Sequence, residues 1–221
     1  AAFDATLDKN GMLLLAGSRE DGPFGNTDFA VCRVDPATGK TVAFAANNEG
    51  CVTVEFDEKA GDLRRSQAYN VIALADGGIV LTGNLAQGPT QEESHVIAAM
   101  AKLKPDGSLD AGFGTVGKRT FTVQQSLGTD FGKCAAASNG KIVCSVGVLE
   151  SQDPFTGHTE FLRFDTHGVL EAAWSGGNNV SVPGFPLTLY FADFALVRNP
   201  AATEDDIVTI GMATDEQQIR Q

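Results

Sequence analysis

Several short groups of residues in this sequence could carry chemistry. Residues 112–117 read G-x-G-x-x-G, the spacing of a dinucleotide-binding loop, and Asp106 and Asp110 offer two carboxylates to a cation. A dinucleotide loop joins a strand to a helix, whereas this one follows the Asp106-Gly107 turn and leads into an expected strand. The Asp106–Asp110 segment lacks the length and the closing acidic ligand of a calcium loop. A β-turn with Asp and Gly in their usual places explains it better.

The remaining candidates give no stronger signal. His95, His158 and His167 do not share a metal-ligand spacing, and no G-x-S-x-G elbow is present. Residues 203–206 are most simply a solvated acidic hairpin tip, and Asn179-Val180-Ser181 is a glycosylation pattern that often arises by chance. The sequence therefore indicates no catalytic, cofactor-binding or metal-binding residue.

Composition narrows the class of protein. The chain has 221 residues, 43% of them hydrophobic, and a formal net charge of −12. This length can bury a core without disulfides or metals. No apolar run approaches the roughly 20 residues of a membrane helix, so no membrane span is expected. The acidic balance disfavours nucleic acid, because it repels phosphate backbones.

An internal repeat organises the chain. Short apolar runs end at Gly17, Gly83, Val146 and Gly211, which are 66, 63 and 65 residues apart. A second marker has the same period: a strand-like segment with a cation, then a turn ending in Gly, then an aromatic residue. Its cations are Arg33, Lys102 and Arg163, its glycines are Gly39, Gly107 and Gly168, and its aromatics are Phe44, Phe113 and Trp174. The recurring cations predict a structural pairing with a neighbouring carboxylate in each unit, with a ring of cations in a channel as the alternative.

Each unit indicates four strands. Apolar runs flank Asp76-Gly77, Asn139-Gly140 and Asn10-Gly11, which predicts hairpins. Residues 94–103 are rich in helix formers, but their counterparts in the other units favour a strand, so a strand is expected there. Four short strands in about 60 residues match a propeller blade. The predicted fold class is all-β: a partial β-propeller of about three and a half four-stranded blades, built from repeats of ~60–65 residues.

The segments 71–84 and 103–123 resemble the delta-60 repeat, a bacterial repeat of about sixty residues. The second unit matches best. The first keeps Asp28-Phe29-Ala30 with Arg33, the third has Trp174 where the family has Phe, and the fourth keeps only its first hairpin. The resemblance implies β-propeller blades in a large secreted or surface-associated bacterial protein. It carries no catalytic residues over to this chain.

The repeat divides the chain into units of approximately 1–60, 61–125, 126–185 and an incomplete 186–221, treated as one repeat domain. A propeller normally closes into a ring, and open strand edges invite association. We therefore expect a second chain, or a twofold copy of this one, to complete the ring.

The four cysteines are expected to form two disulfides. The hairpin turn at Asn139-Gly140 puts Cys134 and Cys144 on neighbouring strands within one residue of direct opposition. Cys32 lies on a third strand, and Cys51 lies where the adjacent fourth strand begins. The expected bridges are Cys134–Cys144 and Cys32–Cys51. Disulfides favour a secreted, periplasmic or cell-surface location.

The expected function is a non-enzymatic interaction module that binds a protein or glycan through loops on one face. The longest connections, residues 19–27, 87–94 and 150–159, all join second to third strands and so gather at one end of the blades. Two alternatives stay open at this point. One is an extracellular hydrolase or lyase with carboxylates at the channel mouth, and the other is a purely structural part of a larger propeller.

Overall fold

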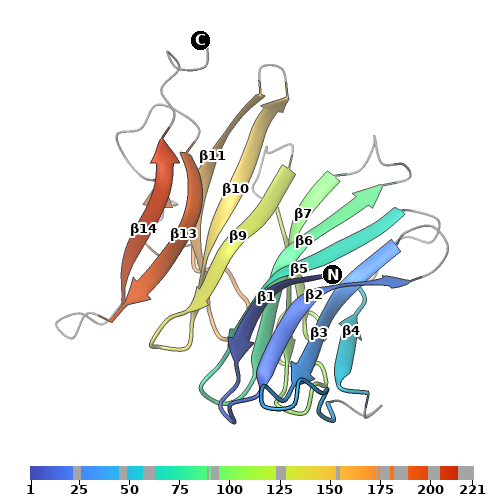
Figure 1. The fold of residues 1–221 in the computed structure, drawn as a ribbon. Coiled ribbons are helices and arrows are strands. Elements are labelled where there is room, and N and C mark those ends of the chain that lie inside the picture. The colour runs from blue at the N-terminus through green and yellow to red at the C-terminus, as the bar shows by residue number, and fades with distance from the viewer. Residues whose placement is uncertain are drawn as a thin grey trace. The chain divides into compact units, whose positions relative to one another are not determined.

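A computed structural model of the chain shows an all-β protein (Figure 1). It describes residues 1–21, 26–44, 49–56, 63–88, 90, 95–122, 128–152, 155–172, 174, 180–181, 189–198 and 205–213. The chain forms two compact units, Ala1–Thr122 and Val123–Gln221. Their boundary falls close to the expected boundary between the second and third repeats.

The first unit contains two antiparallel meanders. The first consists of β1 (Ala2–Leu7), β2 (Leu13–Asp21), β3 (Asn26–Val34) and β4 (Cys51–Val54). The second consists of β5 (Leu63–Ala73), β6 (Ile79–Gly88), β7 (His95–Leu103) and β8 (Lys118–Phe121). A single parallel bridge between Thr27 and Arg65 joins β3 to β5. Hydrogen bonding thus joins all eight strands into one sheet, in which this bridge links two four-stranded meanders.

The core of the first unit lies between the faces of these two meanders. Leu14, Phe29 and Val31 from the first meander cluster with Leu81 and Ala99 from the second, and all five are fully buried. Burial of apolar side chains stabilises this packing by about 25 cal/mol per Å² of apolar surface removed from water. The meanders thus pack mainly face to face.

The second unit repeats the pattern. A third meander consists of β9 (Gly128–Ala136), β10 (Ile142–Gln152), β11 (Phe155–Phe164) and the short β12 (Val180–Ser181). A hairpin of β13 (Leu189–Val197) and β14 (Asp206–Ala213) follows it. Val143 and Phe161 pack against Phe194 of this hairpin, and the rings of Phe161 and Phe194 meet edge to face at 5.3 Å.

The first strand of every repeat carries one extra residue. In β1 the extra residue is Phe3, which lies opposite the bond between Ala16 and Gly17. In β5 the extra residue is Tyr69, which lies opposite the bond between Thr82 and Gly83. In β13 the extra residue is Ala192, beside Gly211 and Ile210. β9 also has one extra residue, but its register shift lies one position earlier along the partner strand β10 than in the other repeats, between Cys144 and Val146. A bulge bends a strand and strengthens its twist, so each first strand is bent at the same position or one position away from it.

The predicted strands and turns are largely confirmed. Residues 95–103 form a strand, so tertiary context outweighs their helix propensity. The turn glycines of both markers have positive φ, which favours residues without a Cβ. They are Gly11, Gly77 and Gly140 in the first hairpins, and Gly39, Gly107 and Gly168 after the third strands.

The expected lengths of two connections are wrong. β2 continues to Asp21 and β3 begins at Asn26, while β10 continues to Gln152 and β11 begins at Phe155. Most of the polar residues assigned to those loops are therefore strand residues. Antiparallel sheets can expose one face to water, so polar composition alone does not mark the end of a strand. The remaining turn residues 22–25 and 153–154 lie outside the described part of the chain.

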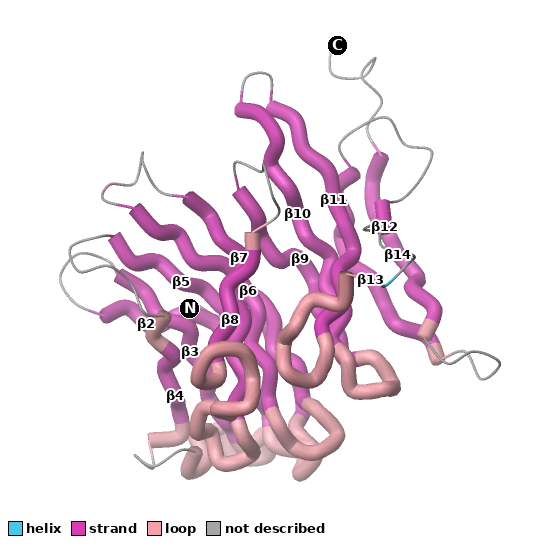
Figure 2. Tube along the Cα trace, turned by 180° about the vertical axis from the view of Figure 1, so that it is seen from behind, coloured by secondary structure: helices cyan, strands magenta, loops and turns pink. Residues whose placement is uncertain are grey.

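Within the first unit, the turns separate into two ends. The β1–β2 and β5–β6 turns lie at one end, and the ends of β2 and β6 with the starts of β3 and β7 lie at the other, because β3 and β5 run parallel (Figure 2). The strand ends that flank the expected second-to-third-strand connections therefore lie at the same end in these two meanders.

Candidate functional site

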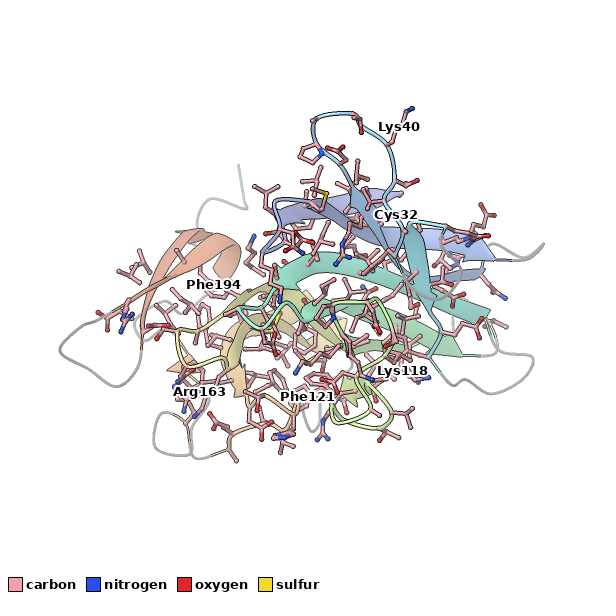
Figure 3. All side chains as sticks on the ribbon, turned by 90° about the horizontal axis from the view of Figure 1, so that it is seen from below. Cys32, Lys40, Lys118, Phe121, Arg163 and Phe194 are labelled. Carbon is pink, nitrogen blue, oxygen red and sulfur yellow. A yellow bond between two sulfur atoms is a disulfide. The ribbon has the colours of Figure 1, made fainter. Side chains whose placement is uncertain are left out.

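Both disulfides join neighbouring strands. Cys32 on β3 is bonded to Cys51 on β4, and Cys134 on β9 is bonded to Cys144 on β10. The members of each pair lie directly opposite each other in the strand register, with Cα atoms 4.0 and 4.1 Å apart. This is the pairing expected from the hairpin positions. Figure 3 labels Cys32 on the first unit.

The recurring cations pair with carboxylates, as expected. Lys102 Nζ lies 3.1 Å from Asp110 Oδ2, and Arg163 Nε donates a hydrogen bond to Glu171 Oε2. In these two units the carboxylate follows the cation by eight residues. Arg33 departs from this spacing and pairs with Asp8 at 3.1 Å, without the alignment of a hydrogen bond. The cations are therefore engaged in structural pairs.

The marker aromatics complete this arrangement. The Arg33 guanidinium lies 4.4 Å from the centroid of the Phe44 ring, and that of Arg163 lies 5.0 Å from the Trp174 ring. Both distances are within the range of cation–π attraction. The aromatic position therefore pairs with the cation in the first and third units.

The loop of residues 112–117 and the Asp106 segment are structural. The loop leads into β8, and its Val116 has a positive φ of 51°. Asp106 Oδ1 accepts hydrogen bonds from the Ser108 backbone N–H and hydroxyl, which lower the pKa of Asp106. The hydrogen bond from Lys102 is the largest factor that lowers the pKa of Asp110. Asp106 therefore stabilises its own turn, and Asp110 forms the recurring ion pair with Lys102.

The three histidines lie on different elements of the fold. His95 begins β7 and is exposed, His158 lies on β11, and His167 lies in the turn after β11, 3.8 Å from Asp165. No group of three His, Cys, Asp or Glu that could hold a metal ion exists within the described residues. Asn179 of the glycosylation pattern lies outside them.

Asp205, in the expected acidic hairpin tip, also makes a long-range contact. Its carboxylate accepts hydrogen bonds from the backbone N–H and the hydroxyl of Ser138, at 2.5 and 2.7 Å. Ser138 belongs to the β9–β10 turn, 67 residues away. In the first unit, Lys9 Nζ donates to the carbonyl oxygen of Asp76 at 2.9 Å, also across 67 residues. The first turns of successive repeats are thus linked in both units.

Carboxyl groups with clearly shifted pKa values fit structural roles rather than acid catalysis. The resolved shifts are all downward, at Asp35, Asp106, Asp110, Asp165, Glu171 and Asp205. A general acid at neutral pH needs the opposite shift. Among the described residues, the perturbed carboxyls therefore do not support the hydrolase or lyase alternative.

A cavity of about 280 Å³ between the two meanders of the first unit is the strongest candidate site. Phe56 and Leu85 line it and are buried, so they form its base. The more exposed lining residues form its mouth: Ile97 on β7, Lys118, Arg119 and Thr120 on β8, and Thr115 before β8.

Strand pairing positions these side chains. Leu85 pairs with Ile97 two residues before one end of the described β6–β7 ladder, and Lys118 pairs with Ala101 two residues before the other end of β7, so the cavity extends along these strands. Lys118 and Thr120 face the first meander, because they alternate with Arg119 along β8 and Lys118 Nζ donates to the Glu55 carbonyl at 3.0 Å. Figure 3 labels Lys118 at this site.

Sequence reasoning missed this cavity. It singled out Thr115 only as part of the glycine-rich loop and Lys118 only as the start of a strand. The signal available was Lys118-Arg119, adjacent cations in a chain of net charge −12. A second cavity, lined by Arg163, Trp174 and Asp205 in the other unit, measures about 10 Å³ and holds no more than about one water.

Comparisons with known proteins give the fold and no function. No family model matches the chain, and no curated protein matches it. A solved structure of a protein of unknown function from Dyadobacter fermentans is similar over 96% of this chain, with 13% identity and a TM-score of 0.56. The chain spans 61% of the length of that protein.

A second solved structure, an alpha-L-arabinanase from Cellvibrio cellulosa, is 14% identical over 77% of this chain and 56% of its own length. Its TM-score of 0.41 is too low to support an inference. The class that these observations define is an all-β repeat protein that shares its fold with the Dyadobacter protein. The resemblance to the delta-60 repeat stays a prediction.

Within the described residues, the structure contains no helix with the length and hydrophobicity needed to cross a membrane.

Proposed function

We propose that the meanders are blades of a β-propeller, about three and a half of them in this chain. Three features support this arrangement: the face-to-face packing of successive meanders, the repeated bulge in each first strand, and the linked first turns. In addition, Asp4 Oδ2 on β1 accepts a hydrogen bond from the Val71 N–H on β5, which brings the first strands of two repeats together. First strands that approach one another around an axis are the arrangement of a propeller.

We further propose that the protein is a secreted, periplasmic or cell-surface interaction module that binds a protein or glycan. Two disulfides support such a location, because disulfides persist in oxidising compartments. The observation that carries the binding function is the cavity between the first two meanders.

A glycan array and a pull-down with the whole chain test this function. We expect a glycan or protein to be retained by the wild-type chain and lost by Thr120→Trp, because the larger side chain fills the mouth of the cavity. Thr53→Trp is the control, since Thr53 is exposed on β4 and does not line the cavity. Equal binding by the two variants would place the ligand elsewhere and contradict the proposal.

Completion of the ring by a second chain or a twofold copy stays a prediction. Size-exclusion chromatography with light scattering tests it: an assembly of at least two chains is expected, and a stable lone monomer at all concentrations would contradict it.

A further inference from the structure

The mouth of the cavity combines three kinds of group. Lys118 supplies positive charge, Thr115 and Thr120 supply hydroxyls, and Ile97 supplies an apolar surface above the buried Phe56 and Leu85. Such a mixture of apolar walls and a few polar groups is typical of small-molecule sites. A ligand that matches it has a negative group, hydroxyls and an apolar face.

The positive charge is unusual for this chain. Asp and Glu outnumber Lys and Arg by 28 to 16, yet none of the lining residues in the described part of the chain carries a carboxylate.

The size of the cavity limits the ligand. Its volume of about 280 Å³ is near the lower end of the ~300–1,000 Å³ found for small-molecule sites. One ring with its substituents fits that range, and a long segment of a polymer does not. The backbone contact between Lys118 and Glu55 holds the ammonium group at this position.

We infer that this cavity binds the carboxylate of a uronic acid, either free or as a single residue of an acidic glycan. The carboxylate lies beside Lys118, the sugar hydroxyls face Thr115 and Thr120, and the apolar face of the ring packs on Ile97. This inference rests on the proposed binding function and names the chemical class of the ligand.

The test is isothermal titration calorimetry of the whole chain with galacturonate, galactose and acetate. Galacturonate and galactose differ in the carboxylate, so we expect galacturonate to bind at least about ten-fold more tightly, as loss of a charged hydrogen bond predicts. Acetate carries the charge without the ring and is expected to bind more weakly than galacturonate. Binding of galacturonate is expected to weaken with added salt, because salt screens exposed charges.

Variants identify the groups that bind. Lys118→Gln keeps an N–H donor for the Glu55 carbonyl but loses the charge, and we expect galacturonate to bind about ten-fold more weakly to it. Lys104→Gln is the matched control, because it removes one cation from an exposed position that does not line the cavity. Circular dichroism of each variant checks that the fold is kept.

Three results would overturn the inference: equal affinity for galacturonate and galactose, equal loss in Lys118→Gln and Lys104→Gln, or no binding of galacturonate. The proposed function fails separately. If the chain captures a neutral glycan or a protein, and Thr120→Trp abolishes that capture, the binding function stands while the uronate assignment is overturned.

Discussion

The rings of Phe3 and Tyr69 meet edge to face, with centroids 5.2 Å apart and an interplanar angle of 63°. Both residues are the extra residue of a bulge, one on β1 and the other on β5. The bulge residues of two successive repeats thus contact each other through their rings. Edge-to-face pairs of this kind contribute about 0.5–1.5 kcal/mol beyond their buried area.

The bulge explains the glycine that ends the apolar run in each of the first two repeats. A Cβ added to Gly17 would lie 1.8 Å from the Ala1 carbonyl oxygen, and one added to Gly83 would lie 1.8 Å from that of Gln67. The third repeat tolerates Val146 here because its register shift lies one position earlier, opposite Ser145. The hydroxyl of Ser145 accepts a hydrogen bond from the Lys133 N–H at that shift.

Gly83→Ala is therefore expected to destabilise the protein by at least about 2–3 kcal/mol, since the added methyl group meets backbone that must move. Urea unfolding measures the change. Gly112→Ala is the control, because the nearest atom to its added Cβ is a side-chain oxygen at 3.4 Å. Similar stability of the two variants would show that the bulge does not constrain position 83.

The two disulfides offer a matched comparison. Replacing either pair by alanine is expected to cost about 3 kcal/mol, because the bridges close loops of 19 and 10 residues. Urea midpoints of the two double variants measure this cost. Wild-type stability in either variant would contradict the expectation.

The Cys32–Cys51 bridge lies next to the cavity. Cys32–Cys51 holds β4, and Phe56 at the base of the cavity follows β4 by two residues. The Cys32→Ala, Cys51→Ala double variant is therefore expected to lose most binding at the cavity. The Cys134→Ala, Cys144→Ala variant is expected to retain it. Titration of galacturonate, or of the ligand captured by the whole chain, into both folded variants distinguishes them, and equal affinities would disprove the link.

Trp174 tests the pairing of cation and aromatic in the third repeat. It packs beside Val143 and Phe161 and lies under Arg163. Trp174→Ala is expected to destabilise by about 3 kcal/mol through lost packing and lost cation–π attraction. Trp174→Phe restores the residue type found at 44 and 113 and is expected to recover most of that loss in a thermal unfolding experiment. No recovery would show that the ring face over Arg163 does not matter.

Stability is expected to fall in acid partly through Glu171. Burial raises the pKa of Glu171, but the hydrogen bonds from Lys141 and Arg163 together outweigh it and bring the pKa below its ordinary value of 4.5. A pKa that is lower in the folded state means that the unfolded state binds the proton first. This contribution is thus complete above about pH 4.5 and is lost as the pH falls through the lowered value.

Urea midpoints between pH 7 and pH 3 measure this dependence. Glu171→Gln is expected to show a lower midpoint at pH 7 and a smaller decline toward pH 3 than the wild type. Glu20→Gln, at an exposed position on β2, controls for the change in net charge. An unchanged slope in Glu171→Gln would show that the ion pair does not contribute.

Much of this fold could be predicted from the sequence because its rules are local. Turn glycines such as Gly77 and Gly140 are required by positive φ within a few residues of the strands they join. Cys134 and Cys144 lie opposite each other because the turn between them fixes the register. The lengths of the β2–β3 and β10–β11 connections were missed, because polar residues also occur in solvent-facing strands.

The repeat period, the hairpins and the cysteine pairing were thus determined by the sequence alone. Only the tertiary structure decided that Lys118 reaches Glu55, that Asp205 caps the Ser138 turn, and that a cavity opens between two sheet faces. These contacts join residues 63 and 67 positions apart. No local rule specifies such contacts, because they form only when the faces of separate meanders pack together.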